Sequence, residues 1–223
     1  NNQLVGLITV DDVVDIVVEE ATEDLYKLSG TSEINEEKLL HGHIINPILS
    51  RIPWLIITIL GGIIASYLIT YFSTQFNTTL FPLAVSISFI PMLMGLAGNV
   101  GNQSATIVVR GIATGHFKTN NALKYIIREL FIGLVIGLII GGLVFIIAYY
   151  ILHFQPLLIS IVSLAILLNI TTATLLGTFL PLLLRQLHID PAIASAPFIS
   201  TSLDIIGQII YFMLTISIIN YLN

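Results

Sequence analysis

Two long charge-free stretches dominate the pattern of apolar and polar positions along the chain. Residues 52–109 and residues 130–184 contain no Asp, Glu, Lys or Arg. A helix crosses the hydrocarbon core of a bilayer with about 20 apolar residues, so each stretch has room for two crossings. A polar segment at 73–79 divides the first stretch, and a turn near 149–156 divides the second. The pattern therefore predicts helical spans at about 53–72, 81–109, 126–150 and 157–184, with a fifth at about 192–221.

The first fifty residues have a different pattern. Apolar residues recur with helical spacing over 11–28, and Leu4–Val10 has the alternation and composition of a strand. A second helical stretch is predicted over about 33–49. Pro47 and Pro53 are expected to interrupt it, because the residue before a proline avoids helical geometry. A strand without partner strands suggests a piece of a longer protein, with the missing partners upstream.

Composition supports a lipid environment. The chain is 56% hydrophobic and 9% charged, whereas soluble domains contain about 25% charged residues. The predicted fold class is an all-α membrane protein with five transmembrane helices per subunit. The chain has no cysteine, which excludes disulfides, thiolate metal sites and cysteine nucleophiles. It also has no HExxH-type histidine spacing and no nucleotide-binding motif that would power a pump.

Basic residues predict the orientation, because cytoplasmic loops are enriched in Lys and Arg. With five spans, all eight fall on one side of the membrane: Lys27, Lys38, Arg51, Arg110, Lys118, Lys124, Arg128 and Arg185. We therefore expect a multi-pass protein of the plasma (inner) membrane, with the N-terminus in the cytoplasm and the C-terminus outside.

Asp204 is the carboxylate that the predicted fifth span places well inside the membrane. An Asp at the centre of a spanning helix costs roughly 2.5–3.5 kcal/mol on the insertion scale, so a compensating environment is required. A stripe of polar and small residues shares its helical face, namely Pro197, Ser200, Thr201, Gly207, Gln208 and Tyr211. This arrangement favours a water-filled path in which a carboxylate attracts cations. A protonated Asp204 buried in helix packing is the alternative.

Amide side chains form a second polar group, in the predicted second span. Asn99, Asn102, Gln103 and Thr106 share one helical face, and glycines 95, 98 and 101 permit close backbone approach. Exposed backbone carbonyls at membrane depth are tolerated only beside water or protein. The group is therefore either pore-lining or engaged in hydrogen bonds between helices. Gly133, Gly137 and Gly141 in the third span favour close helix packing or dimerisation.

Carboxylates crowd the predicted N-terminal helix, and ten of the thirteen acidic residues lie within residues 1–43. Like charges at helical spacing repel one another. Mg2+ binds oxygen ligands and uses one or two carboxylates while keeping several waters, so it suits such a helix. A plain solvated helix face explains the same charges without a metal.

Several motifs together resemble the MgtE family of Mg2+ channels. They are RIPWL at 51–55, GNVGNQSATIVVRG at 98–111, DPA at 190–192, TSLD at 201–204 and EATED at 20–24. The resemblance covers essentially the whole chain. The glycine-asparagine motif of the second span is long and specific, whereas the DPA triplet alone is weak.

This resemblance implies a homodimer with a pore at the dimer axis, lined by the second and fifth spans. A hydrated Mg2+ would lie between two copies of Asp204, with Ser200 and Gly207 contributing backbone or water-mediated contacts. Residues 1–23 would be the end of a second CBS domain, 24–50 a connecting plug helix and 51–223 the pore domain. Regulatory Mg2+ would bind at the positions that match the family's carboxylates: Asp12, Asp15, Glu20, Glu23 and Asp24. The expected pore-lining residues are Asn99, Asn102, Gln103, Thr201 and Gln208.

The predicted function is passive, electrochemically driven transport of Mg2+ and related divalent cations, gated by cytoplasmic Mg2+ in the full-length protein. The expected partners are a second copy of the chain, the lipid bilayer and divalent cations, and no nucleic acid. A divalent-cation exchanger coupled to H+ or Na+ is the main alternative. An intramembrane aspartyl hydrolase is a remote one, because that chemistry needs two carboxylates that share a proton. A purely structural membrane protein leaves the cost of Asp204 unexplained.

Overall fold

The computed structural model describes residues 6–31, 36–74, 83–116 and 122–222, and this part of the chain is helical without strands. In chain order the elements are α1 (Val10–Leu28), α2 (Glu36–Leu40), α3 (Ile45–Ser73), α4 (Leu83–Ser88), α5 (Ile90–Ala113), α6 (Ala122–Tyr150), α7 (Pro156–Gln186), the 3-10 turn η2 (Pro191–Ile193) and α8 (Ala196–Leu222). The all-α prediction is confirmed for these residues.

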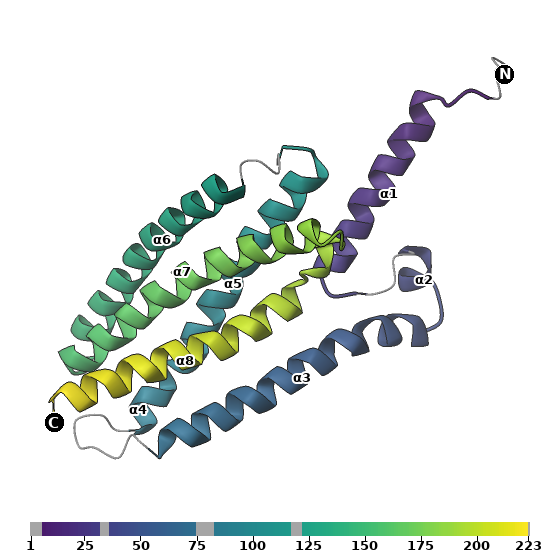
Figure 1. The fold of residues 1–223 in the computed structure, drawn as a ribbon. Helices are drawn as coiled ribbons and strands as arrows, with labels where there is room; N and C mark the ends of the chain where they lie inside the picture. The colour runs from purple at the N-terminus through teal and green to yellow at the C-terminus, as the bar shows by residue number, and fades with distance from the viewer. Residues whose placement is uncertain (1–5, 32–35, 75–82, 117–121, 223) are drawn as a thin grey trace.

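The long helices form an elongated bundle (Figure 1). α7 is the central element, because α6, α5 and α8 all pack against it. α8 in turn contacts α5 on one side and α3 on another. α1 extends away from one end of the bundle (Figure 1). This arrangement places α8, which carries Asp204, between two other long helices.

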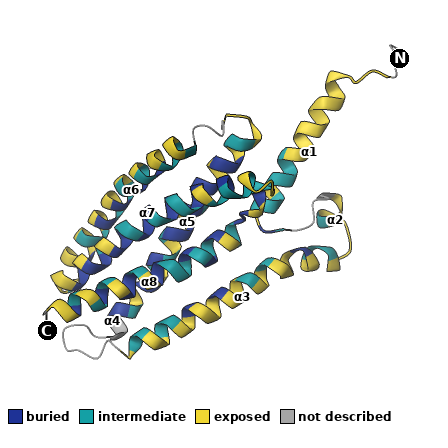
Figure 2. Cartoon of the chain, viewed as in Figure 1, coloured by how far each residue is buried: buried dark blue, intermediate teal, exposed yellow. Residues whose placement is uncertain are grey.

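Four helices in the described part of the chain are long and apolar enough to cross a membrane: α3, α6, α7 and α8. They correspond to the first, third, fourth and fifth predicted spans. Much of the apolar surface of α3 and α6 is exposed, whereas residues between α5, α7 and α8 are buried (Figure 2). Exposed apolar helix faces are typical of a protein surrounded by lipid.

The second predicted span, at 81–109, differs most from the structure. Within the described residues it is divided into α4 and α5, and α5 is not among the four apolar helices. Its amides and glycines lower its apolar character, although it is a 24-residue helix packed on α7 and α8. A fifth membrane crossing therefore stays a prediction.

The expected proline breaks are wrong. α3 begins at Ile45 and continues through both Pro47 and Pro53 to Ser73. Pro47 lies in the first turn, where the missing N–H has no helical acceptor to lose. Pro53 lies inside the helix, a position that transmembrane helices tolerate when neighbouring groups satisfy the freed carbonyl. The first apolar helix is consequently several residues longer than the predicted span.

The beginning of the chain also differs from expectation. Of the predicted strand Leu4–Val10, residues 6–9 have no regular structure, Val10 begins α1, and residues 4 and 5 lie outside the described part. Thr9 caps α1 in a reciprocal capping box with Asp12. The predicted connecting segment 24–50 comprises the end of α1, the short α2 and the start of α3.

Glycines allow α6 to lie directly on α7. A Cβ atom at Gly137 would lie 2.9 Å from the backbone of Leu167, and one at Gly141 would lie 2.8 Å from the carbonyl oxygen of Ser163. Gly133 is similarly close to Thr171. The small-residue repeat of the third span thus packs two helices of one chain together.

Candidate functional site

The middle of α8 carries the carboxylate that the sequence analysis singled out. Asp204 is half-buried, and no described residue forms a hydrogen bond or an ion pair with it. A carboxylate at membrane depth normally faces a partner or a water-filled space. Among the described residues of one copy of the chain, Asp204 is half-exposed and lacks a partner.

α5 reaches this turn of α8 through Asn102. Its side-chain nitrogen donates to the Ser200 hydroxyl at 2.9 Å. Gly98 lies under the same hydroxyl, since a Cβ there would be 3.3 Å from Ser200 Oγ. Ser200 precedes Asp204 by one helical turn on the same face of α8. The hydrogen bond therefore holds the Asp204 turn against the amide-bearing helix.

The amides of α5 line a surface cavity of about 500 Å3. Its walls are Asn99, Asn102, Gln103, Thr106 and Ile107. Asn99, Gln103 and Thr106 are exposed, while the opposite face of α5 is buried. Asn99, Asn102 and Gln103, three of the five predicted pore-lining residues, thus line the same cavity. The polar face of α5 points away from the core of its own chain.

The other two predicted pore-lining residues lie elsewhere. Thr201 is buried beneath α3, where its methyl group occupies the space that a side chain at Gly61 would need. Gln208 is buried, and its amide nitrogen contacts the sulfur of Met94 at 3.4 Å. Helical spacing placed both residues near the face of Asp204. It did not reveal that α3 and α5 cover them.

Gly207 contacts α7 in this structure. Its carbonyl oxygen accepts from Asn169 at 3.4 Å, and the Asn169 amide lies so close that a Cβ at Gly207 would be 3.3–3.4 Å from it. The sequence analysis gave Asn169 no role. The only available signal was an amide inside an apolar span, and such amides commonly join helices.

Three amide oxygens around the centre of α8 are buried without a hydrogen-bond donor in the described part of the chain. They belong to Asn102, Asn169 and Gln208. Buried polar atoms are nearly always paired in folded proteins, either with protein or with ordered water. The surroundings of Asp204 therefore offer acceptor oxygens to water.

The predicted regulatory carboxylates lie in different environments along α1. Asp12 accepts from the backbone and hydroxyl of Thr9, and these hydrogen bonds lower the pKa of Asp12. Asp15 and Glu20 are exposed, whereas Glu23 and Asp24 are half-buried. Across the described ranges, no group of three or more His, Cys, Asp or Glu residues is placed to hold a metal ion. A regulatory role for these residues stays a prediction.

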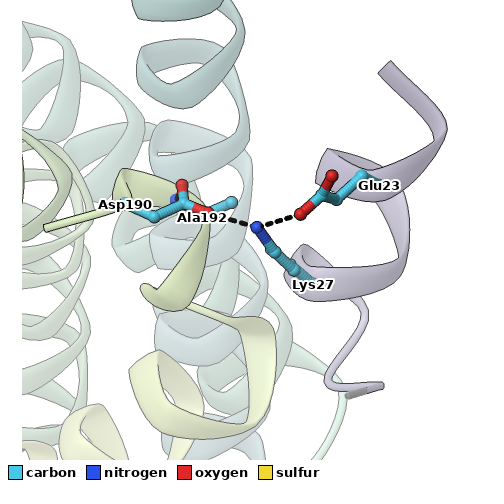
Figure 3. Close-up of polar contacts among 4 residues, drawn as sticks. All are labelled: Glu23, Lys27, Asp190 and Ala192. Carbon is cyan, nitrogen blue, oxygen red and sulfur yellow. Dashed lines mark hydrogen bonds and ion pairs between the residues drawn. The ribbon is translucent and has the colours of Figure 1, made fainter. Parts of the chain in front are cut away.

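A lysine connects α1 to the turn that leads into α8 (Figure 3). Lys27 forms ion pairs with Glu23 on its own helix and with Asp190, whose other oxygen accepts from the backbone of Ala192. Gly30, with φ of 76°, lies against Pro197 at the start of α8. The end of α1 is therefore docked on the base of the Asp204 helix by two contacts.

Charge at this docking point shifts two pKa values. Partial burial and then the charge of Asp190 raise the pKa of Asp24. Burial on its own would lower the pKa of Lys27, but hydrogen bonds to Asp190 and Glu23 outweigh it and raise that pKa. Glu23 and Asp190 thus share one lysine, and the charge of that lysine also acts on Asp24. No sequence pattern pairs Lys27 with Asp190, because the two residues are 163 positions apart.

Comparison with known proteins identifies relatives of the chain. Residues 90–214 match the family model MgtE, described as divalent cation transporter. Proteins called magnesium transporter MgtE are similar over 94–100% of the chain: 35% identical in Thermus thermophilus, 33% in Bacillus subtilis and 32% in Enterococcus faecalis. The chain spans about half the length of these relatives, between 45% and 48%. The matched region runs from α5 into α8 and includes both the amide face and Asp204.

Proposed function

The chain belongs to the MgtE family, and from that premise we propose that it is the ion-conducting membrane part of an Mg2+ transporter. The family is one of divalent cation transporters, and its three relatives named above are magnesium transporters, which favours transport over an enzymatic reaction. The family and the four apolar helices make the chain a multi-pass membrane protein.

The observation that carries this proposal is the environment of Asp204. Its carboxylate is half-exposed and lacks a partner among the described residues. Its helix is hydrogen-bonded to Asn102 of α5, which belongs to a row of amides along the cavity, Asn99, Asn102 and Gln103 (the amide row). In lipid, neither an unpaired carboxylate nor an exposed amide row is stable without water or a second protein surface. A water-filled path that both groups face satisfies both requirements.

A homodimer supplies such a path. With α5 as a fifth spanning helix, the exposed face of Asn99, Gln103 and Thr106 would meet its copy across a twofold axis. α8 would then bring two Asp204 carboxylates to the same conduit, with Ser200 and Gly207 beside them. Mg2+ releases its waters reluctantly, so oxygen acceptors around a wide site suit a hydrated ion. The unpaired amide oxygens near α8 support this hydrated environment.

Transport in this proposal is passive. A membrane potential contributes about 2.3 kcal/mol per elementary charge per 100 mV, and therefore about twice that for a divalent ion. The basic residues at the helix ends nearest α1 favour a cytoplasmic location for that end. Docking of α1 on Asp190 gives the cytoplasmic segment a direct contact with the turn that leads into the pore helix, which suits gating by Mg2+ in the longer protein.

Calorimetry tests the proposed site. Asp204→Ala is expected to abolish Mg2+ binding in the membrane-spanning part of the purified protein, because no other described carboxylate lies beside the amide row. Asp11→Asn, which removes one exposed charge on α1, is the matched control and should bind like the parent. Unchanged Mg2+ binding in Asp204→Ala would refute the proposal.

A second assay separates a channel from a coupled exchanger. Mg2+ uptake into proteoliposomes is measured with a membrane potential alone, and then with an added H+ or Na+ gradient. Passive transport predicts uptake that follows the potential and the Mg2+ gradient only. Uptake that requires the H+ or Na+ gradient identifies the exchanger instead.

A further inference from the structure

A second carboxylate is buried inside the helical bundle. Glu129 lies in the first part of α6 with 6% of its surface exposed. It begins the buried stripe of α6 that continues through Gly133 and Gly137. A carboxylate at this depth is costly unless it is hydrogen-bonded, and such residues commonly have a role. The function proposed above makes no use of Glu129.

The partners of Glu129 connect it to α5. Its carboxylate accepts from the hydroxyl of Ser104, a residue of α5 that is 5% exposed, at 3.4 Å. The Tyr125 side chain, one turn earlier on α6, lies close enough for the charge of Glu129 to act on its hydroxyl. Among the described residues, Ser104 is a hydrogen-bond donor to the Glu129 carboxylate. Loss of this contact leaves a buried acceptor less well satisfied.

Ser104 lies on the buried face of α5, away from the cavity. Asn99, Gln103 and Thr106 form the exposed face of α5, and Ser104 belongs to the buried face. The buried face also contains Gly98 and Gly101, which let Ser200 and Leu203 of α8 approach the backbone of α5 closely. Membrane helices associate through such close packing and through hydrogen bonds between helices, so the polar contacts of α5 contribute to fixing its rotation. Among the described residues, Asn102 with Ser200 and Met94 with Gln208 connect α5 to α8, and Ser104 with Glu129 connects α5 to α6.

We infer that Glu129 is a positioning residue for transport: through Ser104 it fixes the rotation of α5 that turns the amide row toward the cavity. This inference rests on the proposed function, because the amide row matters only if it lines the ion path. Glu129 itself contacts neither the cavity nor Asp204, and it acts through α5.

The absence of cysteine from the chain gives a clean reporter for this rotation. Gln103→Cys places one thiol on the cavity face, and its rate of reaction with a charged, water-soluble thiol reagent is measured in nanodiscs. Glu129→Ala and Ser104→Ala should each change that rate by at least about fivefold, the scale expected when one buried hydrogen bond is lost. The double variant should change it no further, because both substitutions break one contact. Glu129→Gln should behave like the parent, since its amide oxygen still accepts from hydroxyl groups.

Two controls separate positioning from general loss of structure. Ile139→Cys on the exposed apolar face of α6 should stay unreactive in every background, and Ser160→Ala, whose hydroxyl bonds only within α7, should leave the rate at position 103 unchanged. If Glu129→Ala fails to assemble, the comparison of Ser104→Ala with Ser160→Ala decides. An unchanged rate at position 103, additive effects of the two substitutions, or a Glu129→Gln variant that behaves like Glu129→Ala would each overturn the inference.

Transport kinetics provide a second readout. Glu129→Ala should lower maximal Mg2+ flux and leave the half-saturating Mg2+ concentration unchanged, because Asp204 is intact. A higher half-saturating Mg2+ concentration with unchanged maximal flux would contradict a positioning role. The thiol reaction is measured without Mg2+, so an unchanged rate in Glu129→Ala argues only against the positioning role of Glu129. Normal Mg2+ flux in Asp204→Asn argues only against the proposed function.

Discussion

Gly177 of α7 sits against the backbone of α5, and this contact makes a sharp prediction. A Cβ atom at Gly177 would overlap the carbonyl oxygen of Gly101, and would lie 3.0 Å from its carbonyl carbon and 3.1 Å from Ser104 Cβ. Backbone atoms cannot rotate away as a side chain does. Gly177→Ala should therefore push α7 and α5 apart.

The size of the effect follows from two opposing terms. Overpacking of a well-packed interior costs typically about 1–3 kcal/mol, and alanine in place of glycine in a helix gains roughly 0.5–1 kcal/mol. Because the clash is with backbone, the upper part of the overpacking range, about 2–3 kcal/mol, applies, and the net destabilisation is about 1–2.5 kcal/mol. For a chain of this length, that corresponds to a drop in melting temperature of about 2–10 °C.

Thermal unfolding in detergent measures this effect. Gly142→Ala on α6 is the matched control, because a Cβ there meets nothing within 4 Å, and it should melt at or slightly above the parent temperature. A Gly177→Ala variant that melts as high as Gly142→Ala would refute the close approach of α5 and α7.

Three further predictions concern α1 and the core. Lys27→Met should increase hydrogen exchange in α1, by an amount that decreases at high salt because the ion pairs are partly exposed. Lys124→Met is the control, and equal exchange in both variants would contradict docking of α1 through Lys27. Because the folded-state pKa of Asp24 is raised, the contribution of Asp24 to the docking of α1 is greatest below the ordinary value of 3.8 and is lost as pH rises through the raised value. Asp24→Asn should then slow α1 exchange relative to the parent above that pH, and no difference would argue against the burial of Asp24. Tyr211→Phe should lower the free energy of unfolding by about 0.5–1.5 kcal/mol, because it removes a buried hydrogen bond to the Ser86 carbonyl. Tyr221→Phe, at an exposed position, is the control and should leave stability unchanged. Equal melting temperatures of the two variants would show that the Tyr211 hydrogen bond is unimportant.

Hydrophobic patterning predicted the long apolar helices well, because lipid imposes a strong constraint on composition and length. The same constraint explains the failures. α5 carries amides that reduce its apolar character, so its boundaries were misjudged, and Pro53 continues a helix where local rules expect a break. Local helix propensities describe a chain in water, where an interrupted helix can form hydrogen bonds with the solvent. In lipid the backbone N–H and C=O groups must be hydrogen-bonded within the protein, so the helix continues through the proline.

The candidate site was predictable where one helix face determined it. Asn99, Asn102 and Gln103 share a face and line one cavity. The burial of Thr201 and Gln208 could not be predicted from helical spacing, because it depends on how α3 and α5 pack against α8. Glu129 was missed because it stands beside basic residues at the start of an apolar run and resembles part of the polar boundary. Its burial depends on how α6 docks.

Potential-driven Mg2+ flux tests the central claim most directly. Parent, Asp204→Asn and Asp11→Asn proteins are reconstituted in liposomes, and Mg2+ entry is recorded under an inside-negative potential without H+ or Na+ gradients. We expect entry through the parent and Asp11→Asn proteins and none through Asp204→Asn. Entry through Asp204→Asn at the parent rate would contradict a cation path that depends on this carboxylate.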